Sequence, residues 1–263
     1  MESYINFKEV IGMSKQTMMT IISNTKLTHD VYEMVLEGNI QGVVTNPGQF
    51  INIKLDDGET TYLRRPMSIH DYDDHHITMA YKVVGIGTNK MKSMQVDEKL
   101  DVLVGLGNGF TLENIQKALI IGGGVGVPPM YNLAKQYVEA GVEVEVVLGF
   151  NSKDDVFYED KFSKLGKTHI CTMDGSYGMQ GNVVDVIQQL NISYDKYYAC
   201  GPEKMLDALV LFDNDNGYLS FEARMGCGFG ACMGCSCKVK TAPYKRICVE
   251  GPVLKSSEVI VNE

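Results

Sequence analysis

The chain carries little positive charge. Among its 263 residues, 24 are lysine or arginine and 33 are aspartate or glutamate, so the formal net charge is −9. A nucleic-acid-binding protein needs a basic stripe to neutralise phosphates, and this balance argues against such a partner. No run of about 18 apolar residues is present, so the sequence predicts no membrane-spanning helix. No secretory signal is recognisable at the N-terminus either, and we expect a cytoplasmic protein.

Other familiar patterns are also missing. We find no internal repeat and no low-complexity segment. No catalytic triad or acid–base pair stands out, so we predict no catalytic side chain of that kind. The five histidines fit surface or core positions better than ligand positions: His29, His70, His75, His76 and His169. The length suits two domains with a small third one.

Cysteine is where the sequence is most informative. Cys227, Cys232 and Cys235 follow a C-x4-C-x2-C spacing, and Cys248 comes after twelve further residues. This is the spacing of plant-type [2Fe–2S] proteins, in which the fourth thiolate comes from further along the chain. Four thiolates gathered so closely repel one another unless a metal centre holds them. The pattern therefore predicts a one-electron redox protein with these four cysteines as ligands.

Two alternatives compete with the cluster. A structural zinc site also takes four cysteines, but it usually shows two paired knuckles rather than three cysteines in one loop. Disulfides fit poorly with an odd count of seven cysteines and a reducing compartment. We interpret Cys237, which breaks the spacing, as structural, and Cys171 as a core residue.

The C-terminal tail differs in charge from the rest of the chain. Between Ser220 and Glu263 there are six basic and four acidic residues, whereas the remainder is strongly acidic. The basic residues either offset the negative charge of a cluster or form a solvated face.

The first hundred residues read as short strands separated by turns. Five segments alternate or run apolar, namely 17–23, 31–38, 49–55, 77–83 and 101–105, and one helical piece is expected at 88–95. Short strands at this frequency predict an antiparallel β-barrel or sandwich.

From Lys117 onward the pattern changes to alternating strands and helices. Strands are expected at 118–121, 142–148, 168–171 and 196–199, and helices at 128–139, 182–190 and 202–212. Such alternation predicts an α/β domain with a parallel sheet. The predicted organisation is an arm at 1–14, a barrel domain at 15–113, a nucleotide domain at 114–216 and a cysteine module at 217–263.

A glycine turn follows the first strand of the expected nucleotide domain. Gly122, Gly123, Gly124 and Gly126 precede a helix that begins near Pro128. Glycine lets the backbone approach a pyrophosphate, and the helix N-terminus supplies free N–H groups. Cys200, Gly201 and Pro202 end the fourth strand at the same sheet edge, where a ligand could reach them. Cys200 alternatively serves as a small buried residue before a turn.

Two further motifs point to phosphate recognition in the barrel. The segment from Arg64 to Ser68 is expected between strands, and arginine is suited to holding a phosphate. Gly87 and Thr88 lead into the short helix and could cap a phosphate. Each alone could be an ordinary turn or cap, but before a nucleotide domain the two together suggest a flavin dinucleotide.

These motifs occur in the order seen in one known architecture. From about Thr17 to Leu254 the chain resembles the ferredoxin–NADP reductase superfamily, in which a flavin-binding barrel precedes a pyridine-nucleotide domain. The tail EARMGCGFGACMGCSCKV followed by YKRICVEGPVL is similar to the electron-transfer subunits of class 1B dihydroorotate dehydrogenases. Met67 stands where a branched or aromatic residue is common.

The resemblance implies roles for individual residues. FAD contacts are implied for Arg65, Pro66, Met67, Ser68, Ala80, Tyr81, Lys82, Gly87 and Thr88, with Arg65 on phosphate and Ser68 near the flavin N5. Nicotinamide-nucleotide contacts are implied for Gly122, Gly123, Gly124, Gly126, Cys200, Gly201 and Pro202. The four cluster ligands implied are Cys227, Cys232, Cys235 and Cys248.

The implied activity is an electron relay in pyrimidine biosynthesis. An FMN-containing partner subunit, with two copies of each chain in a heterotetramer, would oxidise dihydroorotate, and electrons would pass through [2Fe–2S] and FAD to NAD⁺. Lys153 beside Asp154 and Asp155 favours NAD over NADP. The rival interpretations are a flavin/iron–sulfur reductase that delivers electrons to another acceptor such as an oxygenase, and a zinc-dependent scaffold with a degenerate reductase fold.

Overall fold

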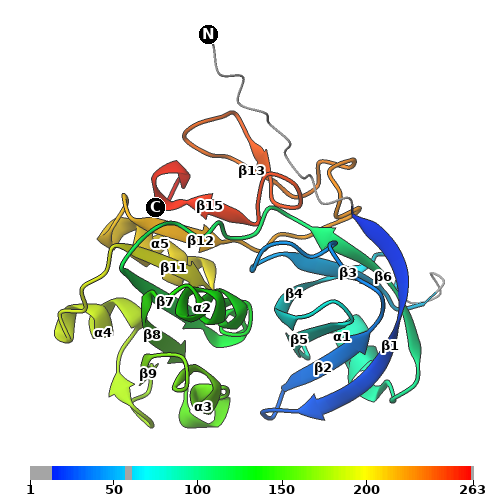
Figure 1. Cartoon of the computed structure of the whole chain (residues 1–263), viewed down its shortest axis with the longest axis horizontal. Helices are drawn as coiled ribbons and strands as arrows, with labels where there is room; N and C mark the ends of the chain where they lie inside the picture. The colour runs from blue at the N-terminus through cyan, green and yellow to red at the C-terminus, as the bar shows by residue number, and fades with distance from the viewer. Residues whose placement is uncertain (1–13, 57–60, 262–263) are drawn as a thin grey trace.

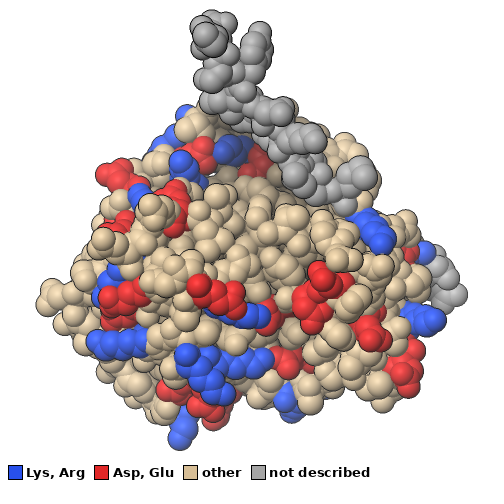
Figure 2. All heavy atoms as spheres, viewed as in Figure 1, with Lys and Arg blue, Asp and Glu red and all other residues tan. Residues whose placement is uncertain are grey.

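We describe a computed structural model of the chain, which covers residues 14–56 and 61–261. Apart from Ser14, the expected N-terminal arm lies outside the described residues. Within them, no helix has both the length and the apolar character needed to cross a bilayer. Figure 2 shows one face of the molecule, on which basic and acidic side chains are interspersed without a continuous basic stripe.

The first part of the chain forms a closed antiparallel barrel with strand order β1-β2-β5-β4-β3-β6 (Figure 1). The strands are β1 Lys15–Lys26, β2 Val31–Glu37, β3 Phe50–Lys54, β4 Arg65–Tyr72, β5 His76–Lys82 and β6 Lys99–Leu106. Alternate apolar residues such as Met34, Leu36 and Ile53 fill its interior, as the two-residue period of a strand requires. Helix α1, Ile86–Ser93, adds Met91 to that core.

The second part is a seven-stranded sheet with order β10-β9-β8-β7-β11-β12-β15. Its strands are β7 Lys117–Gly123, β8 Glu143–Phe150, β9 Lys167–Thr172, β10 Met179–Gln180, β11 Lys196–Cys200, β12 Gly217–Ser220 and β15 Val253–Lys255. Its helices are α2 Met130–Glu139, α3 Glu159–Phe162, α4 Val183–Gln189 and α5 Glu203–Phe212. The order reverses direction between β7 and β11, and the crevice at such a switch point is where α/β sheets bind ligands.

The cysteine-rich tail sits above the junction of the two larger parts (Figure 1). It contains a short antiparallel pair, β13 Ser236–Cys237 and β14 Lys245–Arg246. Its last strand, β15, pairs antiparallel with β12 at the edge of the nucleotide sheet. Buried residues of the tail, including Cys248, share one hydrophobic core with Phe50 of the barrel and Leu119 of the sheet. The three parts therefore fold against one another.

The predicted fold class is confirmed: a barrel, then a parallel α/β sheet, then a small cysteine-rich region. Several details differ, and three of them bear on the sites and on the sheet. The segment at Arg65–Ser68 was expected between strands but lies in β4, because pairing with β3 tolerates Pro66, which lacks an N–H donor. Helix α1 begins at Ile86, two residues before its expected start. Strands β12 and β15 were not expected in the nucleotide sheet, because each is too short to show a pattern.

A polar seam joins the barrel to the nucleotide domain. We define this seam by Glu33 and His70 of the barrel and by Pro128, Tyr158 and Lys161 opposite them. Lys161 Nζ lies 2.8 Å from Glu33 Oε2, and the Tyr158 hydroxyl donates to the same carboxylate. Burial alone would raise the pKa of Glu33, but these two partners lower it below its usual value. The seam is thus an ionised, hydrogen-bonded contact.

His70 lies at the centre of the seam and is 1% exposed. Its Nδ1 lies 2.9 Å from Pro128 O, and because a carbonyl only accepts, Nδ1 carries the proton. Burial, with a smaller contribution from the charge of Lys161, lowers the pKa of His70 to about 4 despite the bond to Pro128. The ring is therefore neutral at physiological pH.

We expect His70 to make folding sensitive to acid. The unfolded ring takes up a proton near pH 6.5 and the folded ring only near pH 4, so stability falls as pH decreases through this window. Between the neutral and the acidic end of this window, the free energy of unfolding should fall by about 3 kcal/mol because of His70. In a His70→Asn variant this contribution is absent. The difference in free energy of unfolding between wild type and variant should be constant above pH 7 and should shrink or reverse towards pH 4; a flat difference over the whole range would contradict the prediction.

Candidate functional site

The cysteine loop between Met225 and Cys237 depends on glycine at two positions. Gly228 and Gly230 have φ angles of 80° and 91°, which side chains other than glycine rarely adopt. At Gly228 a Cβ atom would also lie 2.5 Å from the amide nitrogen of Asn52 in β3. The loop thus bends tightly and rests directly against the barrel.

The four cysteine sulfurs form two close sets. The Sγ atoms of Cys235 and Cys248 are 3.2 Å apart. The Cys227 N–H points to Cys232 Sγ at 3.5 Å, and the Cys232 N–H points back to Cys227 Sγ at 3.4 Å. A [2Fe–2S] centre takes four thiolates, two on each iron. Both the donor set and the N–H groups aimed at sulfur fit such a centre.

The electrostatics of the two sets differ. Burial alone would raise the pKa of Cys227, but backbone N–H groups of Cys232, Phe229 and Ala231 lower it to about 6. The Cys227 thiolate is therefore readily available to a metal. Burial and the adjacent Cys235 sulfur raise the pKa of Cys248 to about 12. A metal must displace the proton from this deeper pair.

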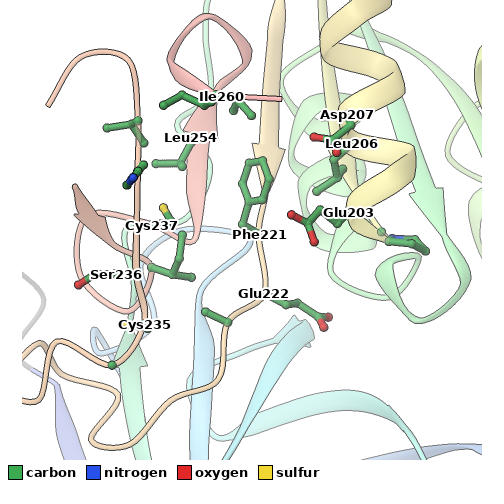
Figure 3. Close-up of a pocket in the computed structure, with 18 residues that line it drawn as sticks. Glu203, Leu206, Asp207, Phe221, Glu222, Cys235, Ser236, Cys237, Leu254 and Ile260 are labelled. Atoms are coloured by element: carbon green, nitrogen blue, oxygen red, sulfur yellow. The ribbon is translucent and has the colours of Figure 1, made fainter. Parts of the chain in front are cut away.

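Cys237 and Cys171 lie apart from this set. Burial raises the pKa of Cys237, and its side chain faces Phe221 across a cavity of about 570 Å³ between the cysteine module and α5 (Figure 3). Glu203 and Asp207 of α5 line the opposite wall. Cys171 is fully buried in the core beneath the sheet, as predicted.

A second cleft, of about 650 Å³, opens at the carboxyl ends of β7 and β11. Five of the predicted nucleotide residues line it: Gly123, Gly124, Gly126, Gly201 and Pro202. A Cβ atom at Gly123 would lie 2.6 Å from Met205 Sδ, so the glycine lets α5 pack closely against the turn. The structure therefore brings together two motifs that are about 80 residues apart in the sequence.

Gly122 and Cys200 do not line this cleft. Gly122 is buried, and a Cβ atom there would lie 2.8 Å from Val127. Cys200 is 2% exposed, and burial raises its pKa to about 12. The Cys200 side chain is therefore buried, as the alternative of a small residue before a turn expects, and a ligand contact at this position stays a prediction. Cys200 is paired with Gly122 across neighbouring strands of the sheet. A side chain at either position points towards the helices that cover the sheet and not along its edge.

Several residues of the cleft were not predicted. Asp30 and Val31 come from the barrel, Phe150 ends the second nucleotide strand, and Asn151 and Asp155 follow it. The position after that strand was the available signal, and the expected preference for NAD already rested on Asp155. Nothing in the local sequence around Asp30 indicates that it faces the other domain.

Glu222 lies where the two cavities meet, because it lines both of them. Within the described part of the chain it forms no hydrogen bond or ion pair. Partial burial of its carboxyl raises its pKa above the usual value. A carboxyl group that is easily protonated thus stands between the nucleotide cleft and the cysteine module.

On the barrel, the two phosphate motifs lie against each other. A Cβ atom at Gly87 would overlap the guanidinium group of Arg65, so only glycine admits that side chain. Thr88 Oγ1 accepts from the N–H groups of Val84 and Gly85 at 2.9 and 3.1 Å and so closes the start of α1. An arginine fork beside a helix N-terminus suits a pyrophosphate.

The other predicted flavin residues divide between two faces. Pro66, Met67 and Ser68 are partly exposed along β4. In β5, Ala80 and Lys82 face the nucleotide domain or the cleft, whereas the Tyr81 ring points into the barrel core and its hydroxyl donates to Asn24. Only the backbone of Tyr81 is available to a ligand on the outside of β5.

Large apolar side chains are exposed next to this motif. Tyr62 and Leu63 precede Arg64, and Val84 and Ile86 precede Gly87; they are 85%, 54%, 78% and 72% exposed. Exposed apolar groups gathered at one place are typical of a surface that a ligand or partner covers. The residues present therefore fit a bound flavin dinucleotide.

The basic residues of the tail are largely engaged within it. Lys245 Nζ lies 2.8 Å from Glu258 Oε1, and Arg246 pairs with Glu250. Arg246 Nη1 also donates to Gly230 O at 2.9 Å. These two cations pair with tail carboxylates, and Arg246 also supports the loop backbone and lies close enough to Cys248 for the two to interact electrostatically. Compensation of the cluster's charge by the basic tail stays a prediction.

Comparison with known proteins supports these sites. Residues 222–260 match the model of the iron–sulfur cluster binding domain of dihydroorotate dehydrogenase B, and residues 120–210 match an oxidoreductase NAD-binding domain. The electron transfer subunit of NAD⁺-dependent dihydroorotate dehydrogenase B from Fusobacterium nucleatum is 46% identical over 92% of this chain and 98% of that protein. The corresponding subunit from a Geobacillus strain is 45% identical over 95% and 100%.

Solved structures agree. The NADH-dependent reduced ferredoxin–NADP oxidoreductase structure, described in connection with flavin-based electron bifurcation, includes a chain with a TM-score of 0.85 and 28% identity, covering 94% of this chain and 91% of that one. The ferredoxin reductase of carbazole 1,9a-dioxygenase has a TM-score of 0.62 at 21% identity, covering 76% and 65%. The latter shows the fold alone.

Replacing one cysteine of either pair should remove the metal centre. We expect Cys232→Ser and Cys248→Ser to retain well under half of the wild-type iron and acid-labile sulfide, because three thiolates hold such a centre poorly. Cys237→Ser is the matched control and should keep both. The measurements are iron and sulfide per chain and the EPR signal after reduction. Normal iron in Cys248→Ser, or loss of iron in Cys237→Ser, would overturn the assignment.

Proposed function

The chain belongs to the family of electron transfer subunits of NAD⁺-dependent dihydroorotate dehydrogenase B, and on that premise we propose how its sites act together. Cys227, Cys232, Cys235 and Cys248 would hold a [2Fe–2S] cluster. Arg65 to Ser68, with Gly87 and Thr88, would hold FAD, and the turn from Gly122 to Gly126 would receive NAD. Electrons from dihydroorotate would enter from a partner subunit and leave as a hydride on NAD⁺.

One observation carries this proposal: the cysteine loop touches the strand next to the flavin motif. Asn52 of β3 is fully buried and pairs with Pro66 of β4. Its Nδ2 donates to Cys227 O at 3.4 Å, and its Oδ1 has no hydrogen-bond partner among the described residues. One residue of β3 therefore contacts the cysteine loop and is paired with β4, which supports short-range electron exchange between the two sites.

The cofactors supply the electron chemistry, since a bound flavin exchanges electrons singly with an iron–sulfur centre and in pairs with a nicotinamide. The protein positions and protects them. Backbone N–H groups directed at the Cys227 sulfur favour its thiolate form, and the Cys227 N–H points to Cys232 Sγ. Arg65 and the N-terminus of α1 supply positive charge for a pyrophosphate. Glu222, at the junction of the cavities, can bind or release a proton or orient a polar group of the nucleotide.

Recognition of NAD rather than NADP follows from the rim of the cleft. Asn151 and Asp155 line it after β8, while Lys153 does not. Asp155 is held in place by accepting from the N–H and hydroxyl of Ser152 at 3.1 and 3.0 Å. A fixed carboxylate suits a ribose hydroxyl and repels a 2′-phosphate.

The partner subunit would dock on the cysteine module. Phe229, Met233, Tyr244 and Val249 surround the cysteine loop and are 56%, 39%, 52% and 39% exposed. An apolar patch around a redox centre fits a permanent hetero-complex. We propose that the FMN-containing catalytic subunit covers this patch and that the assembly contains two copies of each chain. We also propose that the domains of this chain have the boundaries 15–113, 114–216 and 217–263.

The decisive experiment separates the chain from its partner. With FAD and cluster in place, the isolated chain should oxidise NADH with an artificial acceptor but should not convert dihydroorotate with NAD⁺. Adding the catalytic subunit should restore that turnover. Substantial dihydroorotate oxidation by the chain alone would refute the proposal.

The docking face is tested with the same assay. Phe229→Asp should raise the dissociation constant of the two-subunit complex about tenfold or more, because the complex would bury this aromatic ring. The rate of NADH oxidation by the chain should not fall. Leu211→Asp, on α5 and 77% exposed, is the matched control and should assemble normally.

Loss of the Arg65 fork should weaken flavin binding. We expect Arg65→Ala to raise the dissociation constant for FAD by roughly 10- to 100-fold, as one charged hydrogen-bonding group contributes about 1.5–3 kcal/mol. Arg65→Lys keeps the charge but not the fork and should be intermediate. Lys92→Ala, on the neighbouring helix α1, is the control. Flavin fluorescence titration gives the constants, and wild-type affinity in Arg65→Ala would exclude the assigned phosphate contact.

A further inference from the structure

His70 connects the two halves of the proposed flavin–nicotinamide site. It lies in β4, two residues beyond Ser68, and its side chain points out of the barrel into the nucleotide domain. There its Nδ1 reaches Pro128 O at 2.9 Å. Pro128 follows directly on the turn whose residues Gly124 to Gly126 line the nucleotide cleft. One side chain thus ties the flavin strand to the nucleotide turn.

The His70 ring is held on both faces. Tyr131 of α2 stacks on one side with ring centroids 4.7 Å apart, and Tyr158 stacks with centroids 4.5 Å apart. On the far edge, Nε2 lies 3.4 Å from Lys161 Nζ. Since Nδ1 carries the proton, Nε2 offers a lone pair to that ammonium group. The ring therefore has little freedom to rotate or slide.

The carbonyl that His70 contacts is a fixed point of the turn. Pro128 O also accepts the N–H of Tyr131 at 3.1 Å, so it belongs to the first turn leading into α2. On the other side of the turn, Gly126 packs so closely on the backbone of Cys200 that a Cβ atom would overlap it. A turn anchored at both ends by the sheet and by His70 keeps one position relative to β4.

We propose that His70 is a positioning residue for hydride transfer: through Pro128 it sets the distance between a nicotinamide in the cleft and a flavin on β4. This inference rests on the proposed function, because it takes FAD to lie along Arg65–Ser68. The rate of hydride transfer falls steeply as the distance between nicotinamide and flavin grows. A misplacement of one ring by about 1 Å can lower the rate roughly 100-fold. His70 touches neither ligand and acts by holding the turn.

Two substitutions separate the hydrogen bond from the packing. His70→Phe keeps a planar ring between the two tyrosines and removes both ring nitrogens. His70→Asn places an amide nitrogen near the position of Nδ1 and so restores a donor for Pro128 O. Tyr158→Phe is the matched control, since it removes the hydroxyl bond to Glu33 within the same seam and leaves the bond to Pro128 intact.

The rate of flavin reduction by NADH is measured in the complete subunit by anaerobic stopped-flow mixing. We expect the limiting rate in His70→Phe to fall about tenfold or more, while the dissociation constant for NADH changes less than about threefold. His70→Asn should recover most of the rate, and Tyr158→Phe should match wild type. Independently of cofactor, hydrogen exchange at amides of residues 122–131 should be faster in His70→Phe and near wild type in His70→Asn.

The outcomes distinguish this inference from the function on which it rests. A wild-type limiting rate and unchanged amide exchange in His70→Phe would overturn the positioning role. If NADH fails to reduce the flavin even in wild type, the proposed function is wrong instead. If His70→Phe does not fold, His70→Gln serves in its place. The glutamine amide reaches towards Lys161 rather than Pro128, so this variant also lacks the hydrogen bond to Pro128 O. Wild-type behaviour of both His70→Gln and His70→Asn would then reject the proposal.

Discussion

The arrangement of this protein depends on the partly buried polar seam between its barrel and its nucleotide domain. Glu33, Tyr158 and Lys161 form one charged cluster, and a neutral His70 lies beside it between two tyrosine rings. Polar groups out of water are costly unless their partners are placed accurately. The two domains can therefore meet in one orientation much better than in others, and within that orientation the His70–Pro128 contact sets the distance between β4 and the glycine turn.

The cysteine module uses a different means of attachment. Its strand β15 completes the nucleotide sheet through β12, and its buried residues join a core that includes Phe50 of the barrel. Apolar burial of this kind is strong but not directional, so Asn52 and the glycine at position 228 supply the precise contact with the cysteine loop. The module is thereby held at the junction, with its cysteine loop against β3 and its apolar patch left exposed.

Sequence reasoning succeeded where the chemistry is local. The cysteine spacing, the glycine turn and the alternation of strands and helices each reflect a constraint within a few residues, and the family and fold class they indicated are confirmed. It failed where partners come from elsewhere. β4 was missed because Pro66 hides a strand that only its pairing with β3 reveals. Asp30 reaches the nucleotide cleft from a segment with no motif of its own, and Glu222 opens the cysteine tail, where no local pattern indicates that it lines both cavities.

The fold class, the candidate cysteine ligands and the two candidate phosphate motifs could thus be predicted from the sequence, because backbone freedom, thiolate chemistry and side-chain periodicity act over short stretches of chain. Only the tertiary structure decided that Cys200 is buried, that Tyr81 points inward, and that His70 links β4 to Pro128. These outcomes depend on which residues, distant along the chain, exclude water from a given side chain, and no local pattern records that.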